Sequence, residues 1–278
     1  MGTFVVYIIK SAVCLIVFYL FYKLLLSKDT FHRFNRIALL SLLFVSFVVP
    51  FGAISLGSTT EMGQQLAVME DFVVQTTPMD LAPTADVSSP AESSQLWILI
   101  AILTYLAGVL FLCSRQLWSL FKMFGLMRNS REEKRMENAT LLVHSKEIAP
   151  FSWMKYIIIS EKDLEENGKE ILTHELAHIQ KKHTWDLILA DICIFSQWFN
   201  PAAWLLKQEL QSIHEFEADD FAAEQADAGD LIRALVKLYR ENANTLTPDP
   251  LYSAFHDSHP PAPVRVQNLT RKLAEGTA

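Results

Sequence analysis

The chain has 278 residues, of which 51% are hydrophobic and only 20% are charged. This composition is more apolar than that of an ordinary soluble protein and indicates a membrane protein. The net charge of −7 provides no basic surface of the kind that binds a phosphate backbone, so direct nucleic-acid binding is not expected. Three cysteines lie within apolar runs and are expected to be buried thiols rather than a disulfide framework: Cys14, Cys113 and Cys193.

Residues 1–126 are predicted to form a transmembrane region with three helical spans. The apolar runs, at about 4–26, 37–56 and 96–118, are long enough to cross a hydrocarbon core of about 30 Å. The first run has no basic start and no small-residue cleavage site, so we expect it to remain as an anchor. Residues 57–95 form the loop between the second and third spans, and we expect this loop to be external.

Charges in the loops predict the orientation of these spans. The loop 57–95 contains neither Lys nor Arg, whereas four basic residues connect the first two spans: Lys23, Lys28, Arg33 and Arg36. Positively charged loops remain in the cytoplasm. The N-terminus is therefore expected outside, and everything after about residue 120 starts on the cytoplasmic side.

The pattern becomes that of a soluble domain after residue 126, and residues 127–248 are predicted to fold together on the cytoplasmic side. The β-branched runs Thr140–His144 and Tyr156–Ser160 predict a small pair of strands. Between Glu165 and Lys182 the apolar residues recur at three- and four-residue spacing, which predicts a helix. Residues 249–278 are expected to be a C-terminal tail.

The helix predicted over 165–182 carries the sequence His174-Glu-Leu-Ala-His178. Histidines four residues apart lie on one helical face, so His174 and His178 can bind one zinc ion per protomer. Glu175 lies between them, where it can act as the general base toward a metal-bound water. We expect His183 to be an interfacial residue, because its spacing does not fit a third ligand on the same helix.

A catalytic zinc needs a third protein ligand, and the acidic cluster 214–220 can supply it. Glu215 and Asp219 are four residues apart, so Glu215 can bind the metal while Asp219 orients a ligand histidine from behind. Glu217 is expected to point elsewhere. Taken alone, this cluster would be read as a solvated acidic face.

The apolar segment 187–206 resembles a fourth span, but a full crossing would place Glu215 on the opposite side of the membrane from His174. Asn200-Pro201 interrupts this run, and facing lipid would be costly for three polar residues: Asp191, Gln197 and Asn200. We therefore predict two antiparallel helices, about 184–199 and 201–224, which form a hairpin that dips into the bilayer and returns.

Residues 171–223, with HELAHIQKKHTWD, WFNPAAWLLKQEL and HEFEADDFA, resemble the BlaR/MecR-type antirepressor metallopeptidases, which are membrane gluzincins. The resemblance extends over about residues 1–240. We expect no penicillin-binding sensor domain of the kind that some members of this family carry. The S-x-x-K motif of such domains occurs at Ser119 and Ser152, but no KTG or SDN motif follows, so we treat both matches as chance. It implies a mainly α membrane fold, in which a cytoplasm-facing zinc protease domain with a small β-sheet follows the three spans. It also implies a multi-pass protein of the bacterial inner membrane.

The resemblance implies a zinc endopeptidase that cleaves a cytoplasmic transcriptional repressor or another regulatory protein in signal transduction. It assigns the role of zinc ligand to His174, His178 and Glu215. It makes Glu175 the general base and Asp219 the carboxylate that supports a ligand histidine. Other expected partners are membrane lipids, a membrane signalling partner and a second copy of the chain. The tail also resembles that of the HtpX/Ste24-type membrane proteases, which makes a quality-control protease the alternative, with a non-catalytic zinc-binding signalling scaffold as another. Four tail residues are candidates for substrate or transition-state contacts: Tyr252, His256, His259 and Arg265.

Overall fold

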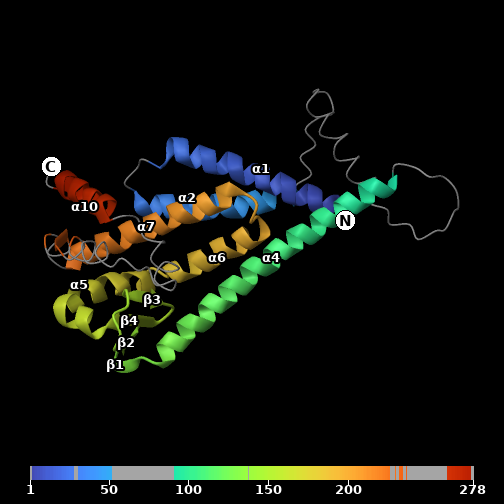
Figure 1. Cartoon of the computed structure of the whole chain (residues 1–278). Helices are drawn as coiled ribbons and strands as arrows, with labels where there is room; N and C mark the ends of the chain where they lie inside the picture. Colours follow the sequence, from blue (N-terminus) through green and yellow to red (C-terminus); the bar gives the residue numbers. More distant parts are fainter. Residues whose placement is uncertain are drawn as a thin grey trace.

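The computed structural model describes residues 2–27, 31–51, 91–136, 138–225 and 262–276, together with Gly229, 232–233 and 236. The described part is mainly helical and carries one small sheet (Figure 1). Two of its helical segments, Phe4–Leu25 and Leu99–Arg128, are long and apolar enough to cross a membrane. The loop 57–95 lies outside the described residues except for its last five, which begin a helix.

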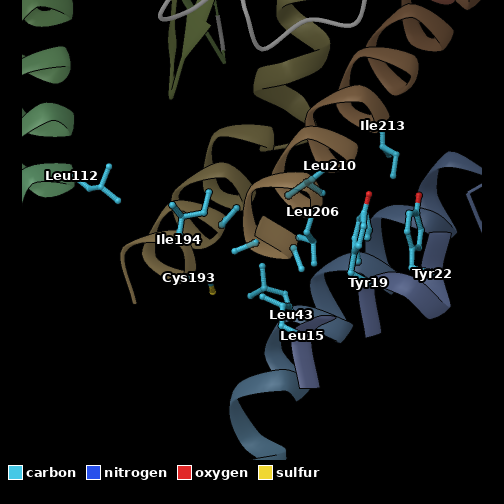
Figure 2. Packing of buried hydrophobic residues seen from close by; sticks show 14 residues of the cluster. Leu15, Tyr19, Tyr22, Leu43, Leu112, Cys193, Ile194, Leu206, Leu210 and Ile213 are labelled. Atoms are coloured by element: carbon cyan, nitrogen blue, oxygen red, sulfur yellow. The ribbon is translucent and has the colours of Figure 1, made fainter. Parts of the chain in front are cut away.

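Four helices pack into one bundle: α1 (Gly2–Leu25), α2 (His32–Val48), α6 (His183–Ser196) and α7 (Pro201–Gln225). Their facing sides are lined by apolar residues whose side chains are almost fully buried. Figure 2 shows this core, to which α1 contributes Leu15 and Tyr22 and α7 contributes Leu206 and Leu210. The predicted transmembrane region and the predicted protease domain therefore share a hydrophobic core.

The second predicted span, 37–56, is not confirmed. The chain there forms α2 and a short 3-10 helix, η1 (Val49–Phe51), and α2 has only 17 residues. Residues 52–56 lie outside the described part. The helix also begins five residues earlier than the predicted span, so that it contains Arg33 and Arg36, which the sequence pattern assigned to a loop.

The third predicted span belongs to a longer helix, α4 (Ala91–Arg128), which runs along the side of the bundle to the sheet (Figure 1). It contacts the bundle near the end of α6, where the Tyr105 hydroxyl donates to the carbonyl of Ser196 at 2.9 Å. Gly108 lies against Trp198 so closely that a Cβ there would come within 2.3 Å of the indole ring. Most apolar side chains of α4 are exposed, as expected for a helix surrounded by lipid.

The two predicted strands are present within a sheet of four strands, in the order β1-β2-β4-β3. Strands β2 (Thr140–His144) and β4 (Tyr156–Ser160) pair in parallel at the centre. Strands β1 (Arg131–Arg135) and β3 (Phe151–Trp153) add antiparallel edges that the sequence pattern did not predict. One face of the sheet packs on α5 (Glu161–Gln180) through apolar residues such as Ile157 and Ile171.

Helices α6 and α7 pack against each other as a hairpin, and its polar residues are paired within the protein. Gln197 donates to the hydroxyl of Ser11 at 2.7 Å, and Asn200 donates to the carbonyl of Ala12 at 3.1 Å. Asp191 forms an ion pair with Lys207 on the opposite arm. The hairpin tip therefore docks on α1, and the cost of facing lipid is avoided.

The C-terminal segment differs from a simple tail, because Ala262–Gly276 forms a helix, α10, which packs on α7. Leu269 of this helix contacts Ala222 in a small core of its own. The three cysteines are free thiols, and Cys193 is buried while Cys14 and Cys113 are half-buried.

Candidate metal centre

Helix α5 carries the two histidines, and its beginning is fixed by a cap. The hydroxyl of Ser160 accepts a hydrogen bond from the backbone NH of Asp163 at 3.1 Å, as an N-cap residue does. The helix therefore begins at Glu161, four residues before the predicted boundary. One turn separates His174 from His178, and their Nε2 atoms lie 3.2 Å apart.

Helix α7 places the carboxylate of Glu215 beside His174 and His178. Its Oε2 lies 3.3 Å from His174 Nε2, and its Oε1 lies 3.4 Å from His178 Nε2. Two atoms bound at about 2.1 Å to a tetrahedral zinc lie about 3.4 Å apart, so this spacing fits such an ion. The three residues form a group that can hold a metal ion. His178 is the most exposed of them, with 14% of its side chain accessible.

Asp219, one turn along α7 from Glu215, lies beside Nδ1 of His174. Its Oδ1 is 3.1 Å from His174 Nδ1, and the side chain is completely buried. Burial and the nearby Arg265 lower the pKa of His174, but hydrogen bonds with Asp219 and Glu215 outweigh them and raise it to about 9. In the metal-free protein, His174 is therefore a protonated imidazole between two carboxylates.

Arg265 of α10 completes this side of the centre. Its Nε donates to Asp219 at 2.8 Å, and its Nη1 lies 3.1 Å from Glu215. Burial disfavours the guanidinium charge, but Asp219, Glu215 and Glu175 outweigh this effect and raise the pKa of Arg265. The same cation lowers the pKa of Asp219 against the effect of burial, which keeps that carboxylate ionised. The arginine offsets the negative charge of the metal-free site.

His183 is buried rather than interfacial, which corrects the sequence-based expectation. Lys182, between α5 and α6, adopts a left-handed conformation with φ of 58°, and the chain turns sharply there. This turn brings His183 back against α5, where its Nδ1 lies 2.8 Å from Nδ1 of His178. Glu217 lies outside the metal-binding group and instead faces His183, with its Oε2 3.1 Å from His183 Nε2.

The pair His183–Glu217 belongs to a larger buried cluster. Arg36 of α2 donates to Asp186 at 2.6 Å, to Glu217 at 3.1 Å and to the carbonyl of Lys181 at 2.7 Å. His214 stacks on the ring of His183 with centroids 4.0 Å apart and contacts Asp186. Burial, His214 and Arg36 lower the pKa of His183 to about 2, so its imidazole is neutral.

The remaining predicted site residues fall into two groups. Glu175 lies on α5 between the two histidines, is 6% exposed and contributes to the charge around Arg265. Tyr252, His256 and His259 lie outside the described residues. Of the four tail candidates, Arg265 is the one that the described structure brings into the site.

Sequence reasoning missed Arg36, Asp186, His214 and the role of His183. Arg36 was counted as a charged loop residue, and His183 would lie about 140° around an unbroken helix from His178. The sequence did contain one indication of the role of Glu217. It is two residues from the candidate ligand Glu215, so it lies on a different face of the helix and needs a partner there.

Comparison with known proteins gives a similarity over part of the chain. Residues 194–273 match peptidase family M48. A CAAX prenyl protease 1 homolog of Arabidopsis thaliana is 41% identical over 85 residues, which cover 30% of this chain and 20% of that protein. CAAX prenyl protease 1 of Saccharomyces cerevisiae is 32% identical over 85 residues, which cover 30% of this chain and 19% of that protein. The matches therefore span about a fifth of the length of these relatives.

A solved structure, that of S. mikatae Ste24p, overlaps 85% of this chain and 73% of its own, with 17% identity and a TM-score of 0.37. The family match begins inside α6, after the helix that carries His174 and His178. The chain is thus similar to peptidase family M48 over the segment that contains Glu215, Asp219 and Arg265.

Proposed function

We propose that this protein is a membrane-embedded zinc-dependent endopeptidase with His174, His178 and Glu215 as metal ligands. The observation that supports this proposal most strongly is the spacing of 3.2–3.4 Å between the ligand atoms, which fits tetrahedral zinc. The similarity of residues 194–273 to peptidase family M48 supports the same chemistry independently. Glu175 beside the ligands favours catalysis over a structural zinc site, because a structural site needs no base.

Each side chain around the proposed zinc site has a separate role in peptide hydrolysis. Bound zinc would supply a Lewis acid and an acidified water at this point. Glu175 takes a proton from the attacking water and returns it to the leaving amine. Asp219 holds His174 by its Nδ1, which leaves Nε2 toward Glu215 and His178, where it would be free to bind the ion, and Arg265 keeps Asp219 ionised.

The substrate would bind in an extended conformation along the sheet. Strand β3 is an edge of the sheet and packs against α5, the helix that carries the catalytic motif. An extended peptide can add to such an edge through backbone hydrogen bonds. We propose that β3 receives the substrate, because it is the edge strand that packs against the helix of the proposed ligands His174 and His178.

The site lies just beyond one end of the bundle. Lys23 of α1 forms an ion pair with Glu209, and Glu215 is six residues further along α7, or about 9 Å. Asn200 docks at Ala12, which is about 16 Å back from Lys23 and therefore near the middle of a core about 30 Å thick. With the N-terminus outside, the proposed metal centre faces the cytoplasm at the membrane surface.

The proposed chemistry is compatible with two classes of substrate. A cytoplasmic repressor or other regulatory protein is implied by the resemblance of residues 171–223 to antirepressor peptidases. The relatives reported above are CAAX prenyl proteases, and their similarity favours a membrane protease of the HtpX/Ste24 type. The zinc endopeptidase chemistry is common to both.

The test is cleavage by the full chain in nanodiscs. Purified protein is incubated with unfolded membrane proteins and with candidate repressors, and the products are identified by mass spectrometry. We expect cleavage by the wild type and none by Glu175→Gln, with equal zinc content in both. Equal product formation by the two proteins would contradict the proposal, as would no cleavage of any substrate by the zinc-loaded wild type.

A further inference from the structure

An unbroken series of contacts connects α2 with the proposed ligand His178. Arg36 donates to Oε2 of Glu217 at 3.1 Å, the same oxygen lies 3.1 Å from His183 Nε2, and Nδ1 of His183 lies 2.8 Å from Nδ1 of His178. The side chains of Glu217 and His183 are 3% and 2% exposed, so water cannot easily replace these contacts. We propose that Arg36 of α2 positions the metal ligand His178 through Glu217 and His183. The proposal rests on the metal centre proposed above.

The contacts have one consistent arrangement of protons. Glu217 faces the cation of Arg36 and accepts, so the hydrogen of His183 is on Nε2. Nδ1 of His183 is then an acceptor, and the hydrogen between the two rings belongs to Nδ1 of His178. Nε2 of His178 therefore keeps its lone pair, and this is the atom that faces His174 and Glu215.

Arg36 also fixes the turn that presents His183. Its Nη2 donates at 2.7 Å to the carbonyl of Lys181, directly before the left-handed residue Lys182. Its Nε donates to Asp186, one turn into α6. A single side chain of α2 thus holds both the start of α6 and the carboxylate that orients His183.

The two ligand histidines are then supported from different directions. His174 is held by Asp219 and Arg265, which belong to α7 and α10. His178 is held from α2, a helix of the bundle core. The placement of α2 therefore affects metal affinity, although none of its residues belongs to the metal-binding group.

The experiment is zinc binding by the full chain in nanodiscs, measured by competition with a chromophoric chelator. Loss of an outer hydrogen-bond partner typically weakens metal binding about 10–100-fold. We expect a loss in this range for His183→Leu and for Arg36→Met. In His183→Asn the amide oxygen can take the place of Nδ1 and accept from His178, so this variant should bind zinc within about threefold of wild type.

Lys23→Met is the matched control, because Lys23 joins another helix of the bundle to α7 through Glu209 without contacting the metal centre. Its zinc affinity should equal that of wild type. The proposal is overturned if His183→Asn loses as much affinity as His183→Leu, or if Arg36→Met binds like Lys23→Met. If Arg36→Met does not fold, the two His183 variants decide alone. Because the experiment measures zinc affinity, its result does not depend on whether the protein cleaves any substrate.

Discussion

Asn200 at the tip of the α6–α7 hairpin donates a hydrogen bond to the backbone carbonyl of Ala12 in α1, at 3.1 Å. Its Oδ1 accepts from the backbone NH of Ala202 at 3.0 Å and so caps α7. One side chain therefore fixes both where α7 begins and how deep the hairpin reaches along α1.

Replacing Asn200 by Ala should lower the free energy of unfolding by about 1–3 kcal/mol, because a helix cap and a buried hydrogen bond are lost together. Chemical unfolding in detergent micelles measures this difference. Asn129→Ala is the control, since Asn129 is exposed at the end of α4 and its replacement should change stability by less than about 0.5 kcal/mol. Equal losses for the two variants would refute the docking role of Asn200.

The topology can be tested by labelling single cysteines introduced into a cysteine-free background. A membrane-impermeant reagent added from outside should label probes at 76–94 and should miss probes at Lys181 and Gln225. The reason is that, in the proposed topology, the second arm of the hairpin returns to the side from which the first arm entered. External labelling at Gln225 would mean that the segment 187–206 crosses the membrane completely.

Glu215→Ala should reduce zinc affinity by more than the roughly 10–100-fold that loss of an outer partner costs, because it removes a proposed direct ligand. Glu217→Ala should fall within that range. Glu209→Ala should leave zinc content unchanged, because Glu209 lies on the same helix but pairs with Lys23. Metal content after dialysis against a chelator measures all three, and equal retention by Glu215→Ala and Glu209→Ala would show that Glu215 is not a ligand.

Zinc uptake should release about one proton at pH 7, because hydrogen bonds with Asp219 and Glu215, working against burial and Arg265, raise the pKa of His174 to about 9 in the metal-free protein. Apparent zinc affinity should therefore rise about tenfold per pH unit as the pH approaches 9. Calorimetric titration in two buffers of different ionisation enthalpy measures the proton count. Zero proton release would contradict the protonated state of His174.

The same shift affects the stability of the metal-free protein. The pKa of His174 in the folded state lies above its ordinary value of 6.5, so the contribution is fully present below about pH 6.5. It is lost as the pH rises through about 9. Unfolding of the chelated protein at pH 6 and pH 9.5 checks this direction, and greater stability at the higher pH would speak against it.

The part of the site that depends on helical periodicity could be predicted from the sequence. His174 and His178 share a face because they are four residues apart, and Glu215 and Asp219 do so for the same reason. Asn200-Pro201 marked the reversal of the hairpin, because proline cannot continue a helix whose backbone NH it lacks. These signals are local, because each depends only on residues within about one helical turn of one another.

The contacts around His178 could not be predicted in this way. They depend on a left-handed lysine, and a non-glycine residue in that conformation has no reliable sequence signature. They also depend on Arg36, which is separated from Asp186 by 150 residues. The edge strands β1 and β3 were missed because β1 is exposed and highly charged and β3 has only three residues.

Helix α7 has a practical consequence for anyone who wishes to produce this protein. Its first half belongs to the core shared with α1 and α2, and its second half carries Glu215 and Asp219 without a break between them. A fragment that starts at the sheet would keep His174, Glu175 and His178 but would leave Leu206 and Leu210 without α1 and α2, which share their core (Figure 2). We therefore expect a truncated form to aggregate, so crystallisation or screening should begin from the full chain in detergent or nanodiscs.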